Sequence, residues 1–321
     1  MNNLKKIGLS ALAGSLVATS AFAGEMSVSG SAKATYTDRG ETTNTGNNFG
    51  MNKLLSFTGS GDLDTGHSIS VYFGNNGTSQ SSASMTYDMG DMGSLTLDNG
   101  VGGHGIGSID DKTPTAAEEI WDNIDHGTGH DGYRVGVGNA GALAYKTTLG
   151  GVSVSADYVK QGGGSLEDGA TGAAGSGSSK SVALTMNVSD GLSIGAGMGD
   201  AGTSNESVDS EQKTIFATYA MGAVSAGAQY SAEDTTATGN WRTTQWGLTF
   251  NINDNASIGY GQRTVDFGSS STLVDQEDEG FSAAYTMGSM SISANMNKSD
   301  DMHGTAASDK ETTEIAVSFA F

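Results

Sequence analysis

Apolar and small polar residues alternate along most of the chain in short blocks. In the first block, one set of alternate positions is mainly apolar and holds Met26, Val28, Ala32, Ala34 and Tyr36. The positions between them hold Ser27, Ser29, Ser31, Lys33 and Thr35. Successive side chains of a strand point to opposite faces, so this period of two predicts a strand with one apolar and one polar face.

The same alternation recurs in sixteen blocks. They are Met26–Tyr36, Asn52–Gly61, His67–Phe73, Ser82–Met89, Gly93–Asp98, Leu143–Tyr145, Val152–Tyr158, Val182–Val188, Leu192–Met198, Ile215–Met221, Val224–Tyr230, Trp246–Ile252, Ala256–Tyr260, Phe281–Met287, Met290–Met296 and Ile315–Phe321. Another alternating stretch, Tyr133–Val137, is assigned to a long connection. An odd number of strands would leave the two ends of the chain on opposite sides.

The connections between these blocks alternate between short and long. Leu149–Gly151 and Gly222–Ala223 are short, whereas Thr37–Met51, Gln161–Ser179 and Ser231–Trp241 are long. Short turns at one end and long loops at the other are typical of outer-membrane barrels. A β-sandwich has no reason to alternate short and long connections in this way. The G-G-x-G-x-D repeat of a calcium-binding solenoid is absent from the sequence. We therefore expect an all-β fold, a 16-stranded antiparallel transmembrane β-barrel.

Composition is consistent with that fold. Only 36% of the 321 residues are hydrophobic, and there are 49 Gly and one Pro. A disordered acidic chain would share the low hydrophobicity, but the regular alternation, ten Tyr and ten Phe argue against it. After residue 23 there is no run of 18 apolar residues, so no transmembrane helix is expected. A barrel needs none, because only every second side chain meets lipid.

The first residues resemble a secretory signal peptide. Lys5 and Lys6 precede an apolar stretch from Ile7 to Phe22, and Ala21–Ala23 fits an A-x-A cleavage site. We expect a signal peptide over residues 1–23 and a mature barrel over 24–321. Losing the two lysines takes the net charge from -21 to -23, which argues against a nucleic-acid partner. Without any cysteine, disulfides and thiol chemistry are excluded.

One long segment, residues 99–141, breaks the alternation. It contains the only proline, Pro114, after Thr113, a pair that predicts a helix start. Ile120, Trp121 and Ile124 would share one face of that helix, and an apolar face needs a wall to pack against. We therefore expect the segment to fold into the barrel and narrow it. Its candidate constriction carboxylates are Asp110, Asp111, Glu118, Glu119, Asp122 and Asp125.

Aromatic residues gather near the ends of the blocks, on the side predicted to face outward. In a barrel they would form two girdles at the membrane interfaces. They are Tyr36, Phe73, Tyr87, Tyr158, Tyr219, Tyr230, Phe281, Tyr285, Phe319 and Phe321.

Together these features resemble the bacterial trimeric general porins, particularly the alphaproteobacterial type. The matching pieces are Gly24–Gly30, the block Gly93–Leu97 directly before the long third loop, and the terminal Phe321. The resemblance implies a water-filled channel in the outer membrane of a Gram-negative bacterium, a homotrimer, and contacts with lipid and lipopolysaccharide. It also implies that Phe321 is read by the assembly machinery and that loop acids face a basic wall.

The candidate basic residues are Lys33, Arg39, Arg134 and Lys146. Parity places Lys33, Lys146 and Arg263 inward, while Arg39 and Arg134 lie at loop ends. The barrel walls of the porins that this chain resembles usually hold a denser basic cluster than the one predicted here. Charges at a narrow pore sort ions by sign, and because acids are in excess we expect a mild cation preference. No metal site or cofactor is expected, although acidic loops such as Asp275–Glu279 would suit a structural Ca²⁺.

Other functions receive little support from the sequence. His126 and His130 are four residues apart, but Gly127 and Gly129 lie between them, which weakens a metal or acid–base interpretation. No nucleophile or nucleotide-binding motif is present, so we do not expect an enzyme. An adhesin or anchor would need a plugged lumen. The main alternative is a substrate-specific channel, which the inward Tyr72 favours only weakly.

Overall fold

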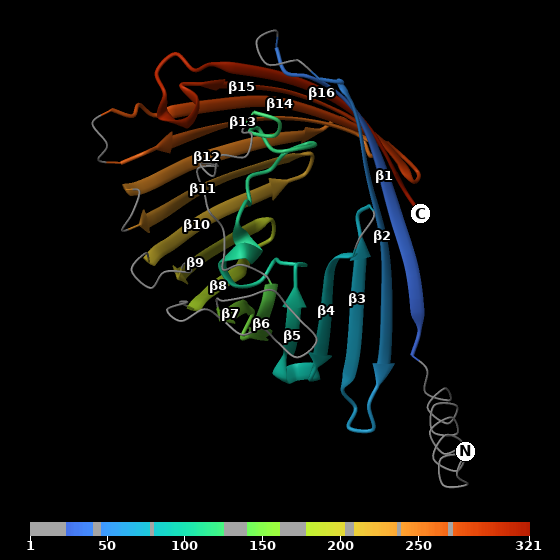
Figure 1. Cartoon of the computed structure of the whole chain (residues 1–321). Helices are drawn as coiled ribbons and strands as arrows, with labels where there is room; N and C mark the ends of the chain where they lie inside the picture. Colours follow the sequence, from blue (N-terminus) through green and yellow to red (C-terminus); the bar gives the residue numbers. More distant parts are fainter. Residues whose placement is uncertain are drawn as a thin grey trace, which may run out of the picture.

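The computed structural model describes residues 24–40, 46–77, 80–124, 140–160, 178–202, 209–235, 239–268 and 272–321. Within them, sixteen antiparallel strands pair with their sequence neighbours, and β1 pairs with β16 to close a barrel (Figure 1). This confirms the predicted 16-stranded barrel. No helix of the described part is long and apolar enough to cross a membrane.

The strands are β1 (Met26–Asp38), β2 (Phe49–Asp62), β3 (Ser68–Asn75), β4 (Gln80–Asp88), β5 (Ser94–Asn99), β6 (Ala140–Leu149), β7 (Val152–Lys160), β8 (Ser178–Ser189), β9 (Leu192–Gly202), β10 (Asp209–Met221), β11 (Val224–Thr235), β12 (Gly239–Asn251), β13 (Ala256–Asp266), β14 (Gln276–Met287), β15 (Met290–Asp300) and β16 (Lys310–Ala320). Short 3-10 helices are η2 (Gly90–Met92), η3 (Gly105–Ile109) and η4 (Met302–Gly304).

Each predicted block falls on one strand, but several strands are longer than predicted. The loop expected over Ser231–Trp241 is largely paired, since Glu233 lies opposite Trp241 across β11 and β12. Beyond the apolar belt the outward residues become charged, as where Arg242 binds Asp234 at 2.6 Å. The apolar pattern ends there while backbone pairing continues, so the sequence pattern underestimates strand length.

The two faces of the wall differ as the alternation predicts. On β10 the outward Ile215 is 58% exposed, whereas the inward Gln212 and Thr214 are almost fully buried. Nine of the ten expected girdle aromatics are exposed on the outer face, and Tyr87 is partly covered by its contact with His67. Strand β1 and the C-terminal residue meet at the short-turn end, where Gly30 and Phe321 exchange two backbone hydrogen bonds of 2.8 and 2.9 Å.

The described part of the segment between β5 and β6, residues 100–124, leaves the wall and lies inside the barrel (Figure 1). The predicted signal peptide, Asp125, Arg134, the Tyr133–Val137 stretch and the His126–His130 pair lie outside the described residues.

Candidate functional site

The infolded segment, residues 100–124, is anchored first by η3. The Gly105 amide donates to Ser155 Oγ of β7 at 2.9 Å, and the Ile106 amide donates to Ser181 Oγ of β8 at 2.8 Å. Ile106 and Ile109 are fully buried against the wall. These contacts fix the start of the loop to β7 and β8 by both polar and apolar interactions.

A buried contact between His104 and Asp98 holds the residues just before η3. His104 Nε2 lies 2.8 Å from Asp98 Oδ2 of β5, and the Asp98 side chain has no exposed surface. Asp98 also accepts hydrogen bonds from the amides of Val101 and Gly102 at 2.8 and 2.6 Å. One carboxylate therefore fixes the turn by which the chain leaves the wall.

After η3 the loop is held by side-chain amides of the wall. Gln229 of β11 donates to the carbonyls of Ile109 and Asp110, both at 2.9 Å, and accepts from the Lys112 amide at 2.8 Å. Gln245 of β12 donates to Asp111 at 2.9 Å. The loop thus follows the circumference of the barrel from strand to strand.

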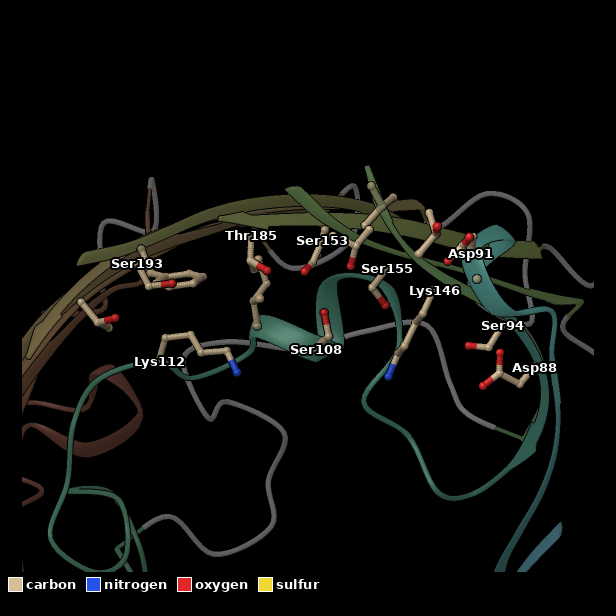
Figure 2. Close-up of a pocket in the computed structure, with 18 of the residues that line it drawn as sticks. Asp88, Asp91, Ser94, Ser108, Lys112, Lys146, Ser153, Ser155, Thr185 and Ser193 are labelled. Atoms are coloured by element: carbon tan, nitrogen blue, oxygen red, sulfur yellow. The ribbon is translucent and has the colours of Figure 1, made fainter. Parts of the chain in front are cut away.

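Two lysines face the same cavity on this side of the barrel. Lys112 of the loop and Lys146 of β6 line a cavity of about 1030 Å³, and Figure 2 shows their amines on either side of Ser108. Among the described residues, neither amine forms an ion pair with a carboxylate. The positive charge on this side is therefore not neutralised by a direct partner.

Further along, a row of wall glycines makes room for the loop. Gly227, Gly247, Gly261 and Gly280 pair directly with one another across β11, β12, β13 and β14. A Cβ at Gly247 would lie 2.3 Å from the carbonyl oxygen of Pro114, and one at Gly280 would lie 2.8 Å from Ile120. The loop backbone can approach the sheet this closely only because these positions lack side chains.

The helix predicted to begin at Pro114 is absent, and that prediction was wrong. Residues 116–124 form bends and turns. The carbonyls of Glu119 and Asp122 accept hydrogen bonds from Asn297 at 3.1 and 3.0 Å, and Lys310 donates to the Ile124 carbonyl at 2.7 Å. These bonds to β15 and β16 take the place of the helical ones.

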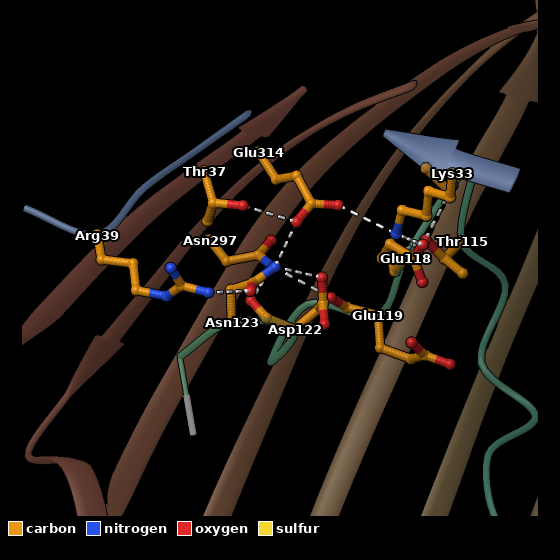
Figure 3. Close-up of polar contacts among 11 residues, drawn as sticks. Lys33, Thr37, Arg39, Thr115, Glu118, Glu119, Asp122, Asn123, Asn297 and Glu314 are labelled. Carbon is orange, nitrogen blue, oxygen red and sulfur yellow. Dashed lines mark hydrogen bonds and ion pairs between the residues drawn. The ribbon is translucent and has the colours of Figure 1, made fainter. Parts of the chain in front are cut away.

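The loop ends this course in a cluster of carboxylates beside one lysine. Lys33 of β1 contacts Glu118 at 2.5 Å and Glu314 of β16 at 3.1 Å, as Figure 3 shows. Glu119 and Asp122 are half-buried beside them. Two of these four carboxylates, Glu118 and Glu314, contact the Lys33 amine, so the acids of this cluster outnumber its lysine.

Asn123 joins this cluster to the barrel wall. Its amide donates to Glu314 at 2.9 Å and to Asp122 at 2.6 Å, and its carbonyl accepts from Arg39 at 3.1 Å (Figure 3). Thr37 donates to the same Glu314 oxygen at 3.0 Å. Arg39 therefore meets the loop through the Asn123 amide, and Lys33 contacts a loop carboxylate directly.

Arg263, the third inward base, is neutralised within the wall. Its guanidinium lies 2.6 Å from Asp278 of β14, and both side chains are almost completely buried. Trp121 of the loop covers it, with the guanidinium carbon 4.5 Å from the ring centre. This stack makes Arg263 a support for the loop, since its charge is already paired.

Comparisons with known proteins agree with this geometry. The family model for Gram-negative porins matches residues 8–321, almost the entire chain. This chain belongs to the Gram-negative porin family. No curated protein sequence matched it.

Solved porins share the fold at low sequence identity. A refined porin structure is 18% identical with a TM-score of 0.66, covering 92% of this chain and 100% of that one. An anion-selective porin from Comamonas acidovorans is 12% identical (TM-score 0.62; 92% and 99% covered). OmpF of Salmonella typhi in complex with daunomycin is 13% identical (TM-score 0.62; 94% and 99% covered).

The carboxylates of the porin loop do not titrate alike. Burial raises the pKa of Asp111, although hydrogen bonds from Thr113 act against the rise. Burial also raises the pKa of Glu119 and of Asp122, and neighbouring carboxylates add to it. Each group resists ionisation because the negative form is both less hydrated and repelled by its neighbours.

The predicted site residues of the porin divide between two places. Glu118, Glu119 and Asp122 gather with Lys33 near β1 and β16, whereas Lys146 lies near β7 and β8 beside Lys112. Asp110 is exposed, and Asp111 is held by Gln245 between the two places.

Sequence reasoning missed the wall residues that hold the loop. Glu314, Asn297 and Gln229 each contact it from more than 100 positions away in the sequence. Their inward parity was visible in the alternation, but which loop atom each one meets depends on the strand register. Which loop atoms the paired glycines approach likewise depends on the strand register.

Proposed function

We propose that this outer-membrane porin is a general diffusion channel for ions and small hydrophilic solutes with a mild preference for cations. The family and the closed barrel make it a channel for small solutes. The observation that supports the cation preference is the cluster of Glu118, Glu119, Asp122 and Glu314 around Lys33. A passing cation is attracted by the uncompensated carboxylates, and an anion is repelled.

The sign of selectivity has to come from side chains, because the barrel itself is compatible with either sign. The Comamonas acidovorans porin of the same fold is described as anion-selective. In the present chain the loop acids outnumber the bases that touch them. Lys112 of the loop and Lys146 of β6 oppose the preference, which is why we expect it to be mild.

We also propose a homotrimer in contact with lipid and lipopolysaccharide. The trimer rests on the resemblance to trimeric general porins. The lipopolysaccharide contact is supported by charged residues on the outer face near the long-loop ends of strands, such as Lys180 with Asp200 at 3.8 Å and Lys213 with Glu211 at 3.1 Å. Those positions lie where polar lipid headgroups are expected.

Single-channel recording in planar bilayers tests this proposal. A trimeric diffusion channel gives large ohmic steps that arrive and close in threes, and neutral sugars cross proteoliposomes at rates that fall smoothly with size. Small steps that one solute blocks completely would instead support a substrate-specific channel. Barrels that insert without conducting would refute the open pore.

A further inference from the structure

We propose that the cavity bounded by Lys112 and Lys146 is a binding subsite for small hydroxylated organic anions, such as sugar acids. The proposal rests on the chain being an open channel, and it names one class of solute that pauses there. The cavity volume of about 1030 Å³ is sufficient for a solute the size of one or two sugar units.

The position of the cavity places it beside the route of a solute. It lies between the start of the infolded loop, represented by Ser108 and Ile109, and the short turn that contains η2. In outer-membrane barrels the short turns face the periplasm. A solute that has passed the loop therefore reaches this cavity next.

The two amines supply the site for the anionic group. Lys112 comes from the loop and Lys146 from β6 of the wall, and both reach the region below Ser108 in Figure 2. Neither is neutralised by a carboxylate of the described residues. A carboxylate or phosphate in the cavity is attracted by both ammonium groups and can accept hydrogen bonds from either of them.

The remaining lining favours hydroxyl groups over an apolar tail. Hydroxyl side chains dominate it, among them Ser94, Ser108, Ser153, Ser155, Thr185, Ser193 and Thr218. These both donate and accept hydrogen bonds, as a polyol does.

Two carboxylates, Asp88 and Asp91, lie at the η2 end of the cavity. They repel a second negative charge but accept hydrogen bonds from hydroxyls. Asp88 already accepts one from the Gly90 amide at 2.8 Å. The lining therefore suits an anion at one end of the ligand and hydroxyls along the rest.

The test compares three solutes added to single channels in planar bilayers. Gluconate is both anionic and hydroxylated, acetate is anionic only, and sorbitol is hydroxylated only. We expect gluconate to cause brief, concentration-dependent partial blocks when added from the short-turn side. Acetate and sorbitol at equal concentration should produce few. Equal blocking by acetate or by sorbitol would overturn the proposal.

Variants assign the blocks to the cavity. Lys112→Gln with Lys146→Gln should reduce the block affinity for gluconate about tenfold, since each lost amine weakens a charge-assisted contact. Lys112→Arg, which keeps the charge, should retain most of it. Lys213→Gln is the matched control, because Lys213 lies on the outer face and pairs with Glu211.

The outcomes separate the subsite from the channel itself. If every variant conducts in ordinary steps and gluconate blocks the Lys112→Gln/Lys146→Gln variant as strongly as the original chain, the subsite is refuted and the channel stands. If neither the original chain nor any variant conducts, both the channel and the subsite are refuted.

Discussion

The described part of the infolded loop of this porin runs between a group of carboxylates and a cavity lined by two lysines. Toward β1 and β14–β16, Glu118, Glu119 and Asp122 crowd around the single Lys33. Toward β6–β10, Lys112 faces a cavity with Lys146 and no direct acidic partner among the described residues. The net charge of -21 reports neither arrangement. Selectivity therefore depends on where the charges lie along the loop more than on their sum.

Removing the acidic end should have the largest effect. In Glu118→Gln/Glu119→Gln/Asp122→Asn we expect the ratio of cation to anion permeability to fall about tenfold, which corresponds to about 1.4 kcal/mol. One carboxylate about 4 Å from an ion contributes about 1 kcal/mol in water, and one ion does not pass all three carboxylates at that distance. The reversal potential across a KCl gradient measures this ratio. Unchanged potentials would mean that ions do not pass near these groups.

Removing the basic end should act in the opposite direction and less strongly. Lys112→Gln/Lys146→Gln should raise the same permeability ratio about threefold, because two charges at a wider place influence a passing ion less. The measurement is again the reversal potential, with Lys213→Gln as the control on the outer face. A fall in the ratio would contradict the assignment of these lysines to the ion path.

Displacing the loop without altering its charge should change how the channel conducts. A Cβ at Gly247 would lie 2.3 Å from the Pro114 carbonyl oxygen, so Gly247→Ala pushes the loop off the wall. We expect a changed conductance and more open-channel noise. Gly59→Ala is the control, because nothing lies within 4 Å of its new methyl group. Matching recordings from both variants would show that the glycine row does not seat the loop.

Lowering the pH should first reduce the negative charge of the loop carboxylates. Because the pKa values of Asp111, Glu119 and Asp122 are raised, these groups bind protons at a higher pH than an ordinary carboxyl, which titrates near pH 4. Cation preference should therefore decline as pH falls from 7.

These three groups should not loosen the fold in that window. A raised pKa means that the folded state binds the proton more tightly, so protonation favours it. Reversal potentials between pH 7 and about pH 4 test the decline, and Glu118→Gln/Glu119→Gln/Asp122→Asn should show much less of it. An equal decline in that variant would assign the titration to other residues.

The barrel was predictable from sequence because period-two alternation is local. Met26, Val28 and Tyr36 define one face of β1 without reference to any other strand. The same alternation correctly predicted that Lys33 and Lys146 face inward.

The loop was less predictable because its partners are distant. Pro114 and Ile120 suggested a helix, but Asn297 and Lys310 take the backbone carbonyls that a helix would use. Arg263 is inward as expected, yet it is neutralised by Asp278 of the next strand. Such pairings depend on strand register, which alternation alone does not specify.

The most direct test records reversal potentials for three proteins in one KCl gradient at neutral pH. They are the original chain, Glu118→Gln/Glu119→Gln/Asp122→Asn, and Lys112→Gln/Lys146→Gln. We predict a cation-side potential for the original chain, a smaller or anion-side one for the acid-neutral variant, and the largest cation-side potential for the lysine-neutral variant. An anion-side potential for the original chain, or the same potential for all three, would contradict this prediction.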